Sequence, residues 1–279
     1  MKLSNIEFGF DNFLAEMKKL KTEKHFDYLV TIVGEDFGPE EGLGCIYILE
    51  NTQTHERISV KQLAKQLGDE YVIPSIYHVW ASSDLLEREV YDFLGIKFLG
   101  HPDMRRLFMR NDFEGWPLRK DFDMSPEKNQ FPMTDEPESD WTSEWNLTKD
   151  GELVETKHRL FDDDDFVINF GPNHPSTHGV LRLQTVVDGE TIKHIYPHLG
   201  YIHRGMEKMM EGMTYPQTLA FTDRLNYLCA MHHRHALVSV IEEAMGVELS
   251  ERIQYIRTIM DELQRIDNHL LFLGTCAQD

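Results

Sequence analysis

The chain has 279 residues, of which 41% are hydrophobic, and its 28 basic and 48 acidic residues give it a formal net charge of −20 at pH 7. This length and composition are typical of about two folded domains. The negative charge argues against unaided binding to nucleic acid or anionic lipid, which requires a basic surface. No stretch approaches the ~20 apolar residues of a membrane-spanning helix, and the first residues lack the apolar core of a secretory signal.

Three cysteines, Cys45, Cys229 and Cys276, are spread along the chain without any CxxC spacing. They predict neither a disulfide framework nor a self-contained zinc or iron–sulfur site, and they fit a reducing compartment. We therefore expect this chain to ligate no metal itself.

Residues 1–124 alternate between helical and strand patterns, which predicts an α/β domain. Apolar residues at helical spacing favour a helix within 5–23, and a second helix is expected over 59–70, closed by Gly68. Runs dense in β-branched and aromatic residues predict three strands, over 26–37, 44–52 and 73–84.

The segment 125–165 differs in composition and is predicted to be an acidic linker. Between 134 and 165 it has twelve acidic and three basic residues, a net charge of −9, close to half of the chain's total of −20. Such a concentration of like charge is typical of a solvated segment. Two tryptophans, Trp141 and Trp145, favour a segment that lies along a surface.

Residues 166–279 are expected to begin with a short strand at 166–171 and a hairpin that turns at Asp188–Gly189, a dipeptide favoured in such turns. Helices dominate from Gly205, and the last helix is expected to begin after Ser250, a residue that suits an N-cap. Apolar residues then recur at steps of three and four along this helix: Ile253, Ile256, Met260, Leu263, Ile266, Leu270 and Leu273.

This apolar stripe has little to pack against in a domain of one hairpin and three or four helices. We therefore expect that further chain or a partner completes the second domain. The expected fold class is α+β: an N-terminal α/β domain, an acidic linker, then a β-hairpin followed by a mainly helical, incomplete domain.

Several polar motifs stand out in the second half, and each has an ordinary structural explanation. In "GPNHPSTHG", 171–179, Pro175 disfavours a helix at His174, so His174 and His178 are not expected to form a helical metal pair. The histidines of "HHRH", 232–235, do not place three ligands on one helix face. A single arginine such as Arg204 is more often a surface residue than part of a site.

Taken together and in order, four motifs resemble the N-terminal part of the D-type (49-kDa-type) subunit of respiratory complex I, the NADH:quinone oxidoreductase. They are "FGPNHPSTHGVLRL" (170–183), "PHLGYIHRGMEK" (197–208), "FTDRLNYLCAM" (221–231) and "ELQRIDNHLLFLG" (262–274). Residues 85–122, "LLEREVYDFLGIKFLGHPDMRRLFMRNDFEGWPLRKDF", resemble the C-type (30-kDa-type) subunit. The chain therefore resembles the fused C/D subunit found in some bacteria.

The resemblance implies a C-type domain at 1–124, the linker at 125–165, and a truncated D-type domain at 166–279. It implies a peripheral subunit on the cytoplasmic face of the bacterial inner membrane, inactive alone. The implied partners are other complex I subunits, above all the iron–sulfur subunit that carries the terminal [4Fe–4S] cluster and the membrane subunit at the quinone entrance.

The resemblance also implies site residues. His178 and Tyr227 would lie on either side of the quinone headgroup, and Asp279 would accept a hydrogen bond from His178. Arg204 would lie beside the partner's [4Fe–4S] cluster. His174 belongs to the same quinone-facing loop, where we expect a mainly structural role.

These residue types suit the chemistry of quinone reduction, with ubiquinone or menaquinone as the substrate. Two electrons and two protons are taken up, and negative charge grows on two ring oxygens. Donors to both oxygens stabilise that charge, and a tyrosine hydroxyl or a histidine N–H can deliver the protons. A carboxylate behind the histidine fixes its tautomer.

Two alternatives stay open at this stage. D-type subunits resemble the large subunit of NiFe hydrogenases, whose N-terminal CxxC would align with Asn226 and Cys229, so one thiolate of the pair is replaced here. The other alternative is a scaffold or assembly fragment without catalysis. In the C-type segment, Glu87, Arg88, Glu89, Asp92 and residues 118–122 are expected to serve the fold and its interfaces.

Overall fold

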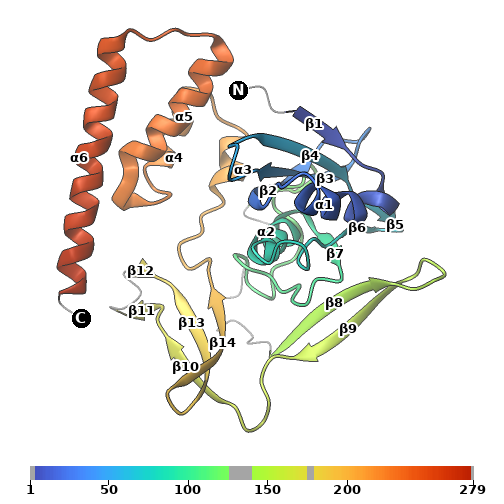
Figure 1. Ribbon diagram of the computed structural model, residues 1–279. Helices are drawn as coiled ribbons and strands as arrows, with labels where there is room; N and C mark the ends of the chain where they lie inside the picture. Colours follow the sequence, from blue (N-terminus) through green and yellow to red (C-terminus); the bar gives the residue numbers. More distant parts are fainter. Residues whose placement is uncertain (1–3, 126–139, 175–178, 278–279) are drawn as a thin grey trace. The chain divides into compact units, whose positions relative to one another are not determined.

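The computed structural model describes residues 4–125, 140–174 and 179–277. The chain divides into two compact units, one formed by Met1–Ile168 with Gln184–Gly200, the other by Asn169–Leu183 with Tyr201–Asp279. Helices and strands are both well represented (Figure 1). The expected α+β class is confirmed.

The first unit contains a four-stranded sheet of order β1-β4-β3-β2. β1 (Ser4–Glu7) pairs parallel to β4 (Arg57–Leu63), while β3 (Leu43–Glu50) pairs antiparallel with both β4 and β2 (Tyr28–Asp36). Alternate residues of β3 are buried, as expected for a strand with one face on a core. Helix α1 (Phe13–Thr22) contributes Phe13 and Met17 to that core.

A five-stranded sheet of order β5-β6-β7-β8-β9 follows in the same unit. The parallel strands β6 (Glu70–Pro74) and β7 (Ile96–Leu99) are connected by helix α2 (Ser83–Leu94), which ends at Gly95 in the left-handed conformation, φ 73°. β5 (Lys65–Leu67) pairs antiparallel with β6. Helix α2 brings Glu87, Arg88 and Asp92 into the interior, so their expected role in the fold is confirmed.

Two expected elements of this unit are wrong. Residues 59–70 form strands, not a helix, because β4 pairs along its whole length with β3 and buries Val60 and even Gln62. The strand expected over 73–84 ends at Pro74, and turns lead to α2. The strands expected at 26–37 and 44–52 are confirmed as β2 and β3, and the helix expected within 5–23 is confirmed only from Phe13 onwards.

The acidic segment contains regular structure that its composition did not predict. β8 (Trp141–Leu147) and β9 (Leu153–Arg159) form an antiparallel hairpin, and β8 continues the sheet alongside β7. The solvated linker expected at 125–165 is therefore corrected for these residues, while 126–139 lie outside the described part. The domain boundaries themselves remain predictions.

Beyond the acidic segment, β10 (Phe166–Phe170), β13 (Arg182–Asp188) and β14 (Thr191–His198) form a three-stranded sheet. The expected hairpin is confirmed, but its turn is formed by Gly189 and Glu190, one residue later than predicted, with Gly189 at φ 61°. Between β10 and β13 lie the two-residue strands β11 (Asn173–His174) and β12 (Gly179–Val180), which pair antiparallel.

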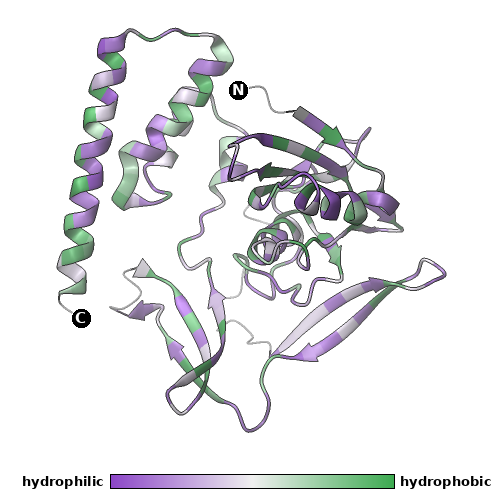
Figure 2. Cartoon of the chain, in the orientation of Figure 1, coloured by the Kyte–Doolittle hydropathy of each residue, from purple (hydrophilic) through white to green (hydrophobic). Residues whose placement is uncertain are grey.

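From Tyr201 onwards the second unit is helical, as expected. Its helices are α3 (Met206–Met210), α4 (Tyr215–Thr222), the 3-10 helix η3 (Tyr227–Cys229), α5 (Ala230–Met245) and α6 (Glu251–Cys276). Ser250 is the N-cap residue of α6, with an extended backbone. Figure 2 shows hydrophobic and hydrophilic residues alternating along α6. Its predicted stripe is exposed in this chain, with Leu263 at 54% and Leu270 at 62%. No helix within the described residues is long and apolar enough to cross a membrane.

Candidate functional site

The three described site residues, His174, Arg204 and Tyr227, all belong to the second unit, although they come from distant parts of the sequence. His174 lies in β11, Arg204 in the loop before α3, and Tyr227 in η3. His178 and Asp279 lie outside the described residues. That the five residues converge on one ligand stays a prediction.

Tyr227 lies on a short 3-10 turn and is exposed. The helical region expected from Gly205 onwards is interrupted here, because residues 223–226 turn and the 3-10 helix η3 precedes α5. The side chain of Asn226 caps η3 by accepting a hydrogen bond from the backbone N–H of Leu228 at 3.2 Å. The Tyr227 side chain is 62% exposed, so it does not pack in the core of this unit. Its hydroxyl is therefore accessible to a ligand.

Arg204 and His174 are also held in short local structures. Arg204 is exposed and directly precedes Gly205, the N-cap of α3. Gly205 has a φ of 62°, in the left-handed region that glycine adopts without strain. The ring of His174 meets that of Phe170 edge to face, with centroids 5.8 Å apart. This contact with Phe170, and the pairing of β11 with β12, support the structural role expected for His174.

Helices α5 and α6 are joined by two polar pairs. Arg257 donates two hydrogen bonds to Glu242, at 2.7 and 2.8 Å, and lowers the pKa of that carboxyl. His235 Nδ1 lies 2.6 Å from Asp261 Oδ2. Both ring nitrogens of His232 are buried, with no hydrogen-bond partner among the residues that the structure describes. Within the described residues, no group of three or more His, Cys, Asp or Glu side chains could hold a metal ion.

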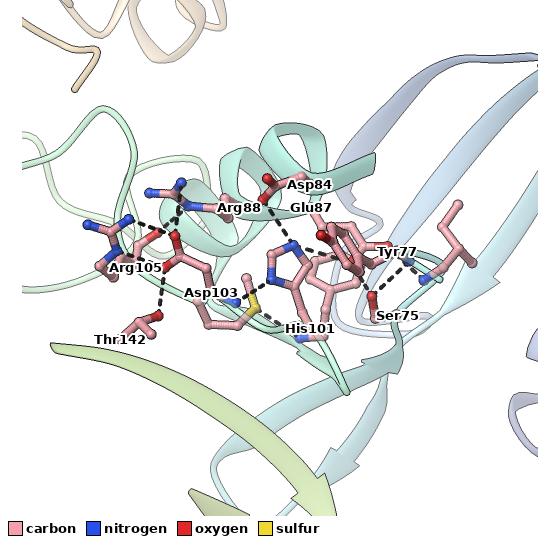
Figure 3. A network of polar contacts seen from close by, with 12 residues as sticks. Ser75, Tyr77, Asp84, Glu87, Arg88, His101, Asp103, Arg105 and Thr142 are labelled. Atoms are coloured by element: carbon pink, nitrogen blue, oxygen red, sulfur yellow. Dashed lines mark hydrogen bonds and ion pairs between the residues drawn. The ribbon is translucent and has the colours of Figure 1, made fainter. Parts of the chain in front are cut away.

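A second polar constellation lies inside the first unit and is centred on Glu87, His101 and Asp103 (Figure 3). Glu87 is fully buried and accepts hydrogen bonds from Ser75 Oγ at 2.6 Å and from the backbone N–H of Ile76 at 2.8 Å. Burial raises the pKa of Glu87 to about 8, although both hydrogen bonds oppose the shift. Glu87 therefore holds a proton at neutral pH.

His101 is fully buried beside Glu87 and has a fixed tautomer. Its Nδ1 accepts a hydrogen bond from the backbone N–H of Asp103 at 3.0 Å, so the proton of the neutral ring is on Nε2. Nε2 lies 3.5 Å from Asp84 Oδ1 and 3.9 Å from Glu87 Oε2, beyond ordinary hydrogen-bond length. Burial lowers the pKa of His101 to about 4.

Asp103 is the anionic centre of the constellation. Burial would raise its pKa, but two hydrogen bonds from Arg105 at 2.7 Å, the nearby charge of Arg88 and a hydrogen bond from Thr142 at 2.6 Å hold it well below the usual range. Arg88 also donates to the backbone carbonyls of residues 105 and 106, both at 3.2 Å. These contacts attach the loop after β7 to α2 and to β8.

A cavity of about 460 Å³ opens beside this constellation. Asp84, Arg88 and Asp103 line one part of it, and Arg159 and the β14 residues His194–Pro197 line another. Glu87 and Arg88 stand out in the sequence within the C-type motif, whereas His101 and Asp103 were not predicted to be site residues. The motif "HPD" at 101–103, just after the buried strand β7, could have indicated them, because polar side chains at the end of a buried strand are well placed to bond to interior groups.

The raised pKa of Glu87 predicts an unusual dependence of stability on pH. Folded Glu87 holds a proton that the unfolded chain, with a pKa near 4.5, releases, so its contribution is lost as the pH rises towards 8. His101 acts in the opposite sense, because its pKa falls from 6.5 to about 4 on folding. Between pH 4.5 and 6.5 the loss of stability due to Glu87 is offset by the gain due to His101, so the free energy of unfolding changes little. We expect a net loss of about 2 kcal/mol in the free energy of unfolding between pH 6.5 and 8.

The measurement is urea denaturation of the wild type and of Glu87→Gln across this pH range. Glutamine copies the protonated acid, since its amide can accept from Ile76 and donate to Ser75 Oγ. The loss should disappear in Glu87→Gln and persist in Glu114→Gln, which changes an exposed carboxylate. Parallel pH profiles for the wild type and Glu87→Gln would contradict the prediction.

Comparisons with known proteins match both parts of the chain. Residues 7–128 match the family model described as "Respiratory-chain NADH dehydrogenase, 30 Kd subunit", and residues 204–275 match the one described as "Nickel-dependent hydrogenase".

Over almost its whole length the chain is similar to proteins named as C/D subunits of NADH-quinone oxidoreductase. It is 52% identical to that of Phocaeicola vulgatus over 98% of this chain and 52% of the relative, and 50% identical to that of Bacteroides fragilis over 95% and 51%. A protein of Aquifex aeolicus, named there as the C/D subunit number 2, is 38% identical over 98% of this chain and 48% of the relative. The chain spans about half the length of the curated relatives it matches.

Proposed function

The chain belongs to the family of C/D subunits of NADH-quinone oxidoreductase, and from this premise we propose that it forms part of the quinone-reduction site of a respiratory complex I. In this proposal the site lies next to the terminal [4Fe–4S] cluster of a partner subunit. The observation that carries it is the 52% identity to a C/D subunit over 274 residues. The exposed Tyr227 supports it, because a residue that serves a ligand must be accessible.

We assign the chemistry of the site residue by residue. Tyr227 and His178 donate hydrogen bonds to the two oxygens of the quinone ring and supply protons as they are reduced. Asp279 fixes the tautomer of His178 and stabilises its protonated form. Arg204 places a positive charge near the partner's cluster, where it favours the reduced state of the cluster. His174 supports the loop that carries His178.

The first unit serves assembly in this proposal. Its buried ion pairs and hydrogen bonds fix the loops after β7, and its surface contacts other complex I subunits. The partners include the iron–sulfur subunit that carries the terminal cluster and the membrane subunit at the quinone entrance. The complete enzyme places the chain on the cytoplasmic face of the inner membrane, and the chain alone is inactive because the cluster belongs to a partner.

The match of residues 204–275 to the hydrogenase family makes a nickel site the second candidate. By the resemblance described above, Asn226 takes the place of the first thiolate of the CxxC pair, and its side chain accepts a hydrogen bond from the backbone N–H of Leu228. Cys229 Sγ, at the second position, accepts one from Asn268 at 3.0 Å. An amide in place of a thiolate does not suit nickel, which these enzymes bind through cysteines. The donor set therefore favours the quinone site.

Photolabelling tests the proposal. Native membranes are irradiated with a quinone that carries a photoreactive azido group, and labelled peptides are identified by mass spectrometry. We expect the label in peptides from 169–183 or 201–229, and excess unlabelled quinone should suppress it. Peptides from the β8–β9 hairpin serve as the internal control and should stay unlabelled. Labelling confined to other subunits would favour the scaffold alternative and contradict the proposal.

A further inference from the structure

The turn that carries Tyr227 cannot hold its own position. η3 is a single 3-10 turn of three residues, Tyr227–Cys229, and such a turn has little stability alone. The exposed side chain of Tyr227 adds little packing energy. Within the described residues no hydrogen bond to the Tyr227 hydroxyl is present. The location of this hydroxyl therefore depends on what holds the backbone of η3.

Helix α6 supplies that support through two amide side chains. Gln264 Nε2 donates a hydrogen bond to the backbone carbonyl of Leu228 at 3.1 Å, and Asn268 Nδ2 donates one to Cys229 Sγ at 3.0 Å. Gln264 and Asn268 are four residues apart, so they project from the same face of the helix. Both hydrogen bonds are partly buried, which limits competition from water.

We propose that Gln264 and Asn268 are positioning residues that hold η3 on α6 and so place the Tyr227 hydroxyl for the quinone. This inference rests on the proposed function, because it names the supports of a residue in that site. The amides attach to the two residues that follow Tyr227, Leu228 and Cys229. They therefore fix the backbone while leaving the Tyr227 side chain free to meet the substrate.

The geometry also explains why amides are found at these positions. The carbonyl oxygen of Leu228 accepts a hydrogen bond and the thiol sulfur of Cys229 is a weak acceptor, and a neutral amide can donate to either without placing a charge near the site. α6 runs for 26 residues from Glu251 to Cys276, so it is a rigid base for a short turn. Displacement of a reacting group by ~1 Å can cost about a hundredfold in rate. Loss of either amide alone leaves the other in place, so we expect a smaller fall in rate.

The test uses the native enzyme in membranes of the source organism, with each substitution introduced into its gene. Gln264→Glu and Asn268→Asp keep the shape of the side chains but remove the donors. Each should lower kcat/KM for quinone reduction by about tenfold. NADH oxidation by an artificial acceptor, which does not use the quinone site, should stay unchanged, and a native gel should show normal assembly.

Two further variants separate positioning from general damage to α6. Gln254 is a matched control, since its Nε2 donates to the carbonyl of Leu249 at 3.2 Å near the start of the same helix. Gln254→Glu should leave quinone reduction unchanged. Gln264→Met also removes the donor to the Leu228 carbonyl but adds no charge, and it should lose about as much quinone reduction as Gln264→Glu.

A double mutant decides whether the amides act through Tyr227. If Gln264 positions the hydroxyl, Gln264→Glu should have little further effect in a Tyr227→Phe background. An equal loss in both backgrounds would overturn the inference, as would failure of both acidic variants to assemble. An unchanged kcat/KM in Gln264→Glu and Asn268→Asp, with a clear loss in Tyr227→Phe, would overturn the inference alone. Full activity in Tyr227→Phe would instead overturn the proposed function.

Discussion

Replacing Asp92 by alanine is expected to lower the free energy of unfolding by about 3–5 kcal/mol. Asp92 is fully buried on α2, and its Oδ1 accepts a hydrogen bond from Arg106 at 2.9 Å. Its Oδ2 accepts from three successive backbone N–H groups, of Leu107, Phe108 and Met109, at 3.0, 2.6 and 2.9 Å. Alanine would leave the three N–H groups without their acceptor and would remove the opposite charge from a largely buried guanidinium.

Urea denaturation followed by circular dichroism at pH 7 measures this effect. Asp92→Asn keeps an oxygen for the N–H groups but turns an NH₂ towards Arg106, so it should be destabilised less than Asp92→Ala. Asp112→Ala is the matched control. It removes a carboxylate that pairs with Arg110 near the surface, and only a small change is expected. Equal unfolding energies for Asp92→Ala and Asp112→Ala would show that Asp92 is not the anchor of this loop.

Local patterns predicted the elements whose stability is largely local. α6 was predictable because its apolar residues recur at helical spacing and Ser250 suits an N-cap. The hairpin was predictable to within one residue because the dipeptide Asp188–Gly189 favours a turn. β4 was not, since its burial of Gln62 arises from pairing with β3, which no local pattern shows. The strands β8 and β9 were not predicted, because the acidic composition of this segment favoured a solvated linker.

The same division applies to the polar sites. Glu87, Arg88 and Asp92 could be singled out in the sequence, but their partners could not. Those of Glu87 lie in the segment before α2, and those of Arg88 and Asp92 lie in the loop after β7. Tyr227 could be identified as a site residue from its motif, but the 3-10 turn that carries it could not be predicted from the sequence. The supports of that turn, Gln264 among them, come from α6 and had no local signal.

Replacing Tyr227 by phenylalanine is expected to lower quinone reduction in the assembled enzyme by about a hundredfold, the usual contribution of a positioned proton donor. Phenylalanine keeps the ring and removes only the hydroxyl, so the exposed side chain should cost the fold little. The measurement compares inhibitor-sensitive quinone reduction in membranes with NADH oxidation by an artificial acceptor. Only the first activity should fall, because electrons would still enter the enzyme but would not reach the quinone.

Tyr215→Phe provides the matched control, since Tyr215 is 71% exposed at the start of α4 in the same unit. It removes the same atom from a comparable surface and should leave quinone reduction unchanged. An equal loss in both variants would indicate general damage to the second unit. Normal quinone reduction in an assembled Tyr227→Phe enzyme would mean that the hydroxyl donates no proton to the quinone.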